Sequence, residues 1–133
     1  MADAISIAGS ALSVHRQWLD AIADNLANAN NVSSTDGAAF QARYIVAQAG
    51  EGAGGQPTGV SVAGIESGDA EGRIVNQPDH PLADADGNVR YPDVDLAEQM
   101  GALIMAQRGY QANAAVVDRA KTSYEAALQI GRS

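Results

Sequence analysis

The chain has 133 residues, a formal net charge of −8 and no cysteine, and only 5% of its residues are aromatic. This length fits a single domain, and the missing cysteines exclude disulfides and thiolate metal sites. Phosphate binding needs clustered Lys and Arg, and the sequence contains no such cluster. The composition therefore argues against nucleic acid or anionic lipid as a partner.

The two ends of the chain differ in character from its middle. Residues 32–95 hold all four prolines and a formal charge of −7, against −2 for residues 1–31 and +1 for residues 96–133. We therefore expect an N-terminal helical arm over 1–31 and a C-terminal helical arm over 96–133, with the two arms forming one domain. An acidic, Gly/Pro-rich β insert and connector would occupy 32–95.

A heptad stripe predicts a first helix, because residues three and four apart lie on one side of a helix. The helix should start at Asp3 or Ser6 and end in the Asn-rich run 25–31, since Asn tolerates the left-handed cap conformation. The N-terminus lacks a basic region and a long apolar core, and no run of 18 apolar residues occurs, so we expect neither a Sec-type signal nor a membrane span. The stripe consists of Ile5, Ala8, Leu12, His15, Leu19, Ile22, Leu26 and Ala29.

The middle of the chain predicts a small antiparallel sheet. Residues 40–46 alternate as a half-buried strand does, and residues 50–59 hold five glycines and suit a flexible hairpin loop or a short disordered tip. A second strand is expected from Val60 to Ile65 and a third at 73–75. Residues 76–95 show no sustained period and predict an ordered or extended connector.

A second heptad stripe predicts the C-terminal helix. This helix should begin after Pro92 with Asp93 or Asp95 as N-cap, since Asp95 and Glu98 have capping-box spacing, and end near Gly131. The fold class is thus mainly α, with the terminal helices paired as a coiled coil and a short antiparallel β segment between them. The stripe consists of Leu96, Met100, Leu103, Gln107, Tyr110, Ala114, Val117, Lys121, Tyr124 and Leu128.

Two stripe positions are polar, Gln107 and Lys121. They are either tolerated polar residues at the edge of the contact, or residues that select one partner and one register at some cost in stability. The sequence leaves both interpretations open.

Metal and catalytic patterns are weak. Asp84, Asp86 and Asn88 suggest calcium, but an EF-hand loop would need Gly where Val89 stands, so an Asx turn is the simpler interpretation. His15 and His80 lack a third zinc ligand at a recognisable spacing. The sequence contains neither a nucleophile elbow nor a phosphate-binding loop, so we expect no enzymatic activity, no metal and no cofactor.

Two motifs near opposite ends of the chain resemble those of the bacterial flagellar axial proteins, the rod, hook and hook-associated families. Residues 25–30 are similar to that family's Asn-Leu-Ala-Asn signature, and residues 108–113 to its Arg-x-Tyr-x-Ala-Asn motif. The run from His80 to Met100 and the short insert resemble the proximal rod proteins in particular, although Asn31 stands where many relatives have Thr. The matching motif residues are Asn25, Leu26, Ala27, Asn28, Arg108, Tyr110, Ala112 and Asn113.

The resemblance implies a structural subunit of the proximal rod in the flagellar basal body, which transmits torque across the periplasm. It also implies export by the flagellar type III system without a cleavable signal peptide. The implied partners are copies of the chain itself, rod proteins of the FlgB, FlgF and FlgG types, and basal-body components such as FliE. Neither nucleic acid nor direct membrane insertion is expected.

We expect the two stripes to pack within or between subunits, so that Leu19→Asp or Val117→Asp blocks incorporation into rods. One alternative is a soluble helical-hairpin adaptor whose β insert binds a separate ligand. Another is a calcium-dependent binding module that uses residues 84–95. The expected assembly interface consists of Ile5, Leu12, Leu19, Ile22, Leu26, Leu96, Met100, Leu103, Tyr110, Val117, Tyr124 and Leu128.

Overall fold

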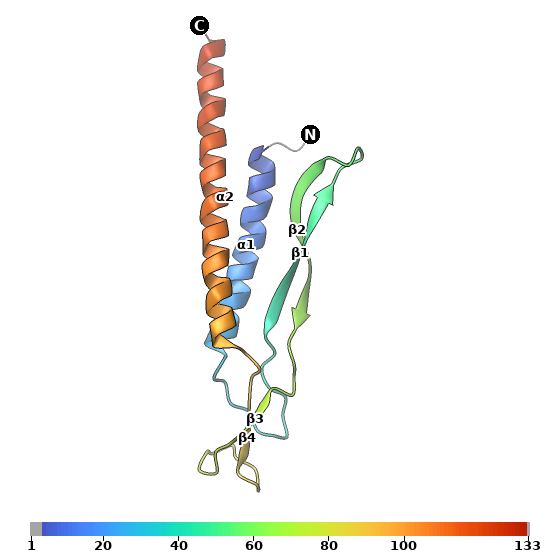
Figure 1. Cartoon of the computed structure of the whole chain (residues 1–133), viewed down its shortest axis with the longest axis vertical. Helices are drawn as coiled ribbons and strands as arrows, with labels where there is room; N and C mark the ends of the chain where they lie inside the picture. Colours follow the sequence, from blue (N-terminus) through green and yellow to red (C-terminus); the bar gives the residue numbers. More distant parts are fainter. Residues whose placement is uncertain (1–3, 133) are drawn as a thin grey trace.

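The computed structural model describes residues 4–132 and shows two helices with two small antiparallel sheets between them. Helix α1 spans Ala4–Ala27 and helix α2 spans Leu96–Gly131. Figure 1 shows α1 lying between α2 and a β hairpin in an elongated molecule. Within residues 4–132, neither helix is both long and apolar enough to cross a membrane.

The hairpin pairs β1 (Arg43–Glu51) with β2 (Pro57–Ser67) in antiparallel register, and Arg43 lies opposite Ser67. The two expected strands are confirmed, but the first begins at Arg43, after the predicted start at residue 40. A register shift between Val46 and Ala47 interrupts the alternation that the sequence suggests. Strands β1 and β2 extend into both ends of the glycine-rich segment 50–59, so the turn between them is short.

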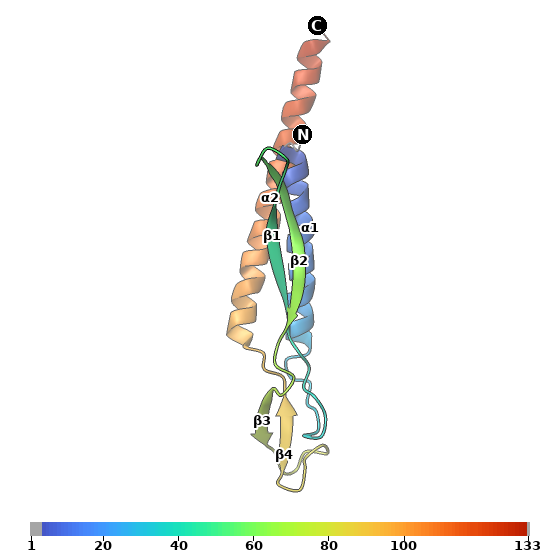
Figure 2. The same ribbon diagram turned by 90° about the vertical axis from the view of Figure 1, so that its right-hand side faces the viewer.

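A second, shorter sheet pairs β3 (Arg73–Asn76) with β4 (Asn88–Tyr91). It lies beyond the ends of the helices, below the hairpin in Figures 1 and 2. Strand β3 was predicted, whereas β4 falls in the segment that we interpreted only as a connector. Four residues are too few to show the alternation of a strand in the sequence. Strand β4 depends on its pairing partners, which include Ser33, because this residue forms a β bridge with Arg90.

The helix ends follow the predicted signals in part. Asp95 is the N-cap of α2, and its carboxylate accepts a hydrogen bond from the backbone N–H of Glu98 at 3.2 Å. Asp3, one of the two expected starts of α1, lies outside the described residues. Below the helices, Ala29, Ala42 and Val94 form a small buried cluster against which Phe40 and Tyr44 pack.

The hairpin is held against α1 near its tip. Ser10 Oγ accepts a hydrogen bond from the backbone N–H of Val60 at 3.0 Å and donates one to the carbonyl of Ile7 at 2.7 Å. Gly59 has a φ of +121° and lies so close to Ser10 that a Cβ would overlap its hydroxyl. Only glycine combines this conformation with this approach. The hairpin therefore covers one face of α1 and leaves α2 uncovered.

Candidate assembly surface

The fully buried residues of helix α2 are small or polar. Gln99 and Ala106 are buried, with exposed fractions of 3% and 0%. Gly109 lies directly against the His15 ring, where a Cβ would overlap Nε2. His15 Nδ1 lies 2.7 Å from the Ala11 carbonyl and donates to it, since a carbonyl oxygen only accepts, and Nε2 faces Gly109. Glycine thus permits the close approach of the two helices.

The buried line on α2 runs one residue before the predicted stripe. Gln99, Ala102, Ala106, Gly109 and Asn113 each precede a stripe position and are buried or half-buried. In α1 the buried residues include Ala8 and Ile22 of the stripe and also Val14, Ala21 and Asn25, each one position before it, while Leu12, Leu19 and Leu26 are half-buried. The stripe of α2 is therefore rotated partly away from α1. Gln107 and Lys121 are both exposed in the monomer.

The two ends of the α2 stripe are exposed. At its start, Leu96 and Met100 are 49% and 50% exposed, and Ile104 beside them is 48% exposed. At its end, Tyr124 is 63% and Leu128 49% exposed. Between the ends, the stripe residues Leu103, Tyr110 and Val117 are half-buried, whereas Ile5 on α1 is exposed.

Helix α2 extends past the start of α1, as Figure 1 shows. Asn25 meets Gln99 and His15 meets Gly109, so Ala4 lies level with about residue 120 of the antiparallel α2. Residues 121–131, which we call the overhang, are exposed throughout. The predicted stripe continues onto the overhang through Tyr124 and Leu128.

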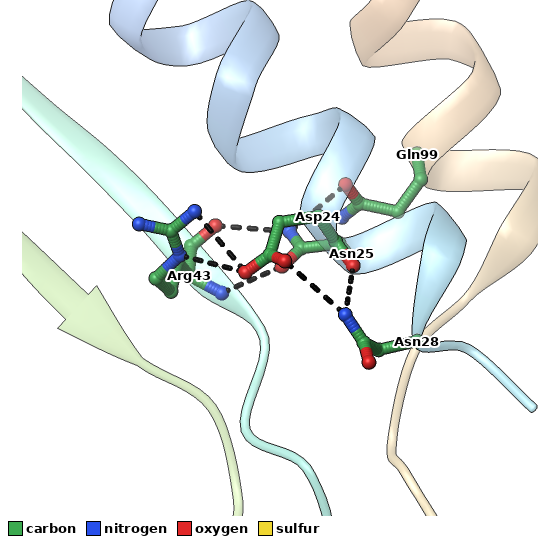
Figure 3. A network of polar contacts seen from close by, with 5 residues as sticks. All are labelled: Asp24, Asn25, Asn28, Arg43 and Gln99. Carbon is green, nitrogen blue, oxygen red and sulfur yellow. Dashed lines mark hydrogen bonds and ion pairs between the residues drawn. The ribbon is translucent and has the colours of Figure 1, made fainter. Parts of the chain in front are cut away.

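A polar junction joins both helices to the hairpin (Figure 3). Asn25 is 1% exposed, and its amide binds both backbone groups of Arg43. Oδ1 accepts from the Arg43 N–H at 2.8 Å, and Nδ2 donates to the Arg43 carbonyl at 2.9 Å. Nδ2 also donates to Gln99 Oε1 at 3.1 Å. One side chain thus satisfies both backbone groups of Arg43, at the start of β1, and connects this strand to α2.

Charged groups support the same junction from outside. The Arg43 guanidinium pairs with Asp24 at 3.1 Å, and Asn28 Nδ2 donates to the Asp24 carbonyl at 2.9 Å. Both partners of the ion pair are about two-fifths exposed, so the pair itself contributes little, on the order of 0–1 kcal/mol. Burial, followed by the nearby carboxylates of Glu98 and Asp93, raises the pKa of the Tyr44 phenol.

The asparagines of the first motif lie in the polar junction, whereas the residues of the second lie on α2, where Asn113 is on the side that faces α1. Asn25 and Asn28 act in the junction, Leu26 is half-buried and Ala27 is exposed. In the second motif, Asn113 Nδ2 donates to the Gly109 carbonyl at 2.8 Å, on the side of α2 that faces α1. Tyr110 is half-buried, and Arg108 and Ala112 are exposed.

Two hollows of about 220 Å³ each lie beside the junction and share Trp18 and Ile45 as walls. One also reaches Gln99 and Ala102 of α2, and the other is lined by Val14 and Ala47. Trp18 is the single tryptophan of the chain, so its fluorescence reports on this region.

The candidate metal residues are placed apart or already engaged. His15 lies on α1, whereas His80 lies in the loop between β3 and β4 and accepts a hydrogen bond from the Leu82 N–H at 3.0 Å. Among residues 4–132, no group of three or more His, Cys, Asp or Glu side chains is arranged to hold a metal ion.

The Asx turn expected at Asp84 is confirmed. Its Oδ1 accepts from the backbone N–H groups of Asp86 and Asn88, each at 2.9 Å, and its Oδ2 accepts from Thr35 Oγ1 at 2.9 Å. The hydrogen bond from the Asn88 backbone, followed by that from Thr35, holds the pKa of Asp84 below its ordinary value. The carboxylate thus ties the β3–β4 loop to the segment after α1.

Comparison with known proteins identifies the family. Residues 5–37 match the family described as "Flagella basal body rod protein", and residues 85–130 match "Flagellar basal body rod FlgEFG protein C-terminal". The flagellar basal-body rod protein FlgC of Yersinia enterocolitica is 43% identical over 95% of this chain and 94% of its own length. FlgC of Salmonella typhimurium is 38% identical over 95% and 94%, and FlgC of Bacillus subtilis 28% over 96% of each chain.

The chain belongs to the FlgC family of flagellar basal-body rod proteins. It is accordingly a structural rod subunit, as the two terminal motifs predicted. The two family matches cover both terminal helices, and the N-terminal match extends into the loop after α1.

Sequence reasoning did not find the partners of Asn25 in this rod protein. Gln99 stands one residue before a predicted stripe position, and nothing local distinguishes it from a solvent-facing Gln. Arg43 is the single basic residue between Arg16 and Arg73, which could have indicated an ion-pair role. The backbone groups of Arg43, which make the closer contacts with Asn25, cannot be recognised from the residue type.

Proposed function

We propose that this FlgC-family chain is a non-enzymatic building block of the proximal rod that self-assembles and co-assembles through its terminal helices to transmit torque across the periplasm. Arms 1–31 and 96–133 would form one assembling domain, paired as a coiled coil once the subunit is packed in the rod. The acidic segment 32–95 would lie outside this layer. The observation that carries the proposal is the exposure of both ends of the α2 stripe.

The exposed stripe is apolar enough to stabilise contacts between subunits. Leu96, Met100, Tyr124 and Leu128 are each about half exposed or more. Completing the burial of one such side chain contributes about 1 kcal/mol, half of the range for full burial. Contacts of this kind, repeated by a rotation and translation that do not close, build filaments.

We further propose that the neighbours in the rod include proteins of the FlgB, FlgF and FlgG types and FliE, in addition to copies of the chain itself. We also propose that the chain is exported through the flagellar type III system. Both points rest on membership of the rod family.

The proposal is tested by motility in a strain that lacks its own rod protein. Met100→Asp and Leu128→Asp place a charge on the exposed stripe and should abolish swimming, whereas Ala115→Asp, at another exposed position of α2, should restore it. Substitutions at Met100 and Leu128 distinguish loss of assembly from loss of folding better than those at Leu19 and Val117, because the latter two are half-buried within the monomer. Swimming by both stripe variants at the wild-type rate would refute the proposal.

A further inference from the structure

The hairpin and helix α2 do not pack against each other, so a groove runs between them over α1. Among the described helices and strands, the hairpin and α2 each contact α1, and neither contacts the other. The two hollows of about 220 Å³ lie in this groove, and Trp18 of α1 and Ile45 of β1 line both of them. Figure 2 shows β1 as the strand of the hairpin on the side of α2. The edge of β1 therefore forms one wall of the groove.

This edge of β1 carries free backbone groups beyond Arg43. The Ala42 carbonyl accepts from the Gly68 N–H at 2.7 Å, on the side of β2, and backbone groups alternate in direction along a strand. The groups of Arg43 therefore point away from β2, where Asn25 bonds them. The N–H and C=O of Ile45 point the same way, and among residues 4–132 nothing bonds them on that side. Strand β1 thus presents an open edge to the groove.

The Asn25 amide occupies one position of an additional strand. A side-chain amide has the same acceptor and donor as a backbone peptide group, and that of Asn25 bonds both the N–H and the C=O of Arg43. A neighbouring strand makes such bonds at every second residue. An extended segment that follows Asn25 along this edge would pair next with Ile45, about 7 Å further on. A helix could not make these bonds, because its backbone groups bond within the helix.

The side chains around the groove define the chemistry of such a segment. Glu98 lines the hollow next to Tyr44, the Asp93 carboxylate also lies near Tyr44, and neither carboxylate forms an ion pair within residues 4–132. Tyr44 and Ile45 are successive residues, so their side chains point to opposite sides of β1. A segment with apolar residues on the Ile45 side and basic residues on the Tyr44 side therefore complements the groove. The hollow on the Ile45 side is lined only by apolar residues, Val14, Trp18, Ile45 and Ala47.

We infer that the open edge of β1 binds an extended segment of a partner protein as a third strand, with apolar side chains against Trp18 and basic side chains towards Glu98. The segment supplies the hydrogen bonds that the Ile45 backbone lacks, and its alternate side chains fill the hollows. The site uses none of the exposed stripe residues of α2, so it goes beyond the proposed function. Its test does not depend on assembly of the rod.

The probe is a capped octapeptide of alternating valine and lysine, titrated into the full chain and followed by the fluorescence of its single tryptophan, Trp18. The signal should saturate with a midpoint at or below about 1 mM, and the Ile45 amide should gain protection from hydrogen exchange. Two further peptides carry N-methyl groups on every valine or on every lysine, and each therefore lacks the N–H donors of one edge. Only one edge of the peptide faces β1, so one of the two should bind at least about tenfold more weakly than the other.

Ala47→Arg places a large side chain over the apolar hollow and should weaken binding of the unmodified peptide at least about tenfold. Gln48→Arg is the matched control, because it adds the same charge at an exposed position on the opposite side of β1, and its affinity should stay within about threefold of wild type. Glu98→Gln should weaken binding up to about fivefold. The absence of a saturable signal, equal binding by the two N-methylated peptides, or equal weakening by the two arginine variants would each overturn the inference.

Discussion

The junction around Asn25 should be a principal stabilising contact between the helices and the hairpin. Asn25→Ala removes three hydrogen bonds, two to the Arg43 backbone at 2.8 and 2.9 Å and one to Gln99 at 3.1 Å. At about 1 kcal/mol net for each bond, the free energy of unfolding should fall by about 3 kcal/mol. Unpaired groups left at a 1% exposed site add to that loss.

The assay is urea unfolding followed by helical circular dichroism and Trp18 fluorescence. With a slope of about 1.5 kcal/mol per molar urea, Asn25→Ala should lower the midpoint by about 2 M. Asn28→Ala is the matched control, because it removes the same side chain from the same motif but loses only bonds to Asp24. It should cost about 1 kcal/mol or less.

Hydrogen exchange adds a residue-level measurement. The Arg43 N–H donates to Asn25 Oδ1 and should lose most of its protection in Asn25→Ala, while the Val60 N–H, bound to Ser10 Oγ, should lose less. Equal destabilisation by Asn25→Ala and Asn28→Ala, or an Arg43 amide that stays protected, would refute this account of the junction.

Three further predictions concern other contacts. Gly109→Ala should destabilise the helix pair by about 1–2 kcal/mol, because the new Cβ meets the His15 ring. Gly101→Ala, which has open space around it, should be neutral or stabilise α2 by up to about 1 kcal/mol. Thermal unfolding of both variants checks this difference. Asp84→Ala should lower the melting temperature at pH 7. Because folding lowers the pKa of Asp84, its stabilisation is present above the ordinary carboxyl pKa and is lost as the pH falls through the folded pKa. The melting temperatures of the variant and the wild type should therefore converge in acid. A constant difference between them down to pH ~2 would contradict this role of Asp84. Leu128→Asp should leave the monomer's melting temperature within about 1 °C of wild type, since that side chain is half exposed on the overhang; a large drop would mean that the overhang is packed in the isolated chain.

Much of the fold could be predicted because its signals are local. The stripe spacing located both helices, and the Asp95–Glu98 pair located the start of α2. Glycines and alternating apolar residues located the hairpin. In contrast, β4 is four residues long and forms by pairing with β3 and with Ser33, so its cause lies far along the chain.

The rotation of α2 could not be predicted from the sequence. A stripe of Leu, Met and Tyr is the obvious choice for a buried side, yet the structure places Ala106 and Gly109 against α1. Close packing against His15 favours small residues there. The large apolar side chains at both ends of the stripe, such as Met100 and Tyr124, remain exposed, which is consistent with their use between subunits.

Basal bodies purified from a strain that carries Leu128→Asp in place of its own rod protein test the central claim most directly. If α2 assembles the rod through its exposed stripe, mass spectrometry should find the Leu128→Asp chain exported but absent from the basal bodies, and the Ala115→Asp chain present at the wild-type level. Normal incorporation of Leu128→Asp would contradict the claim.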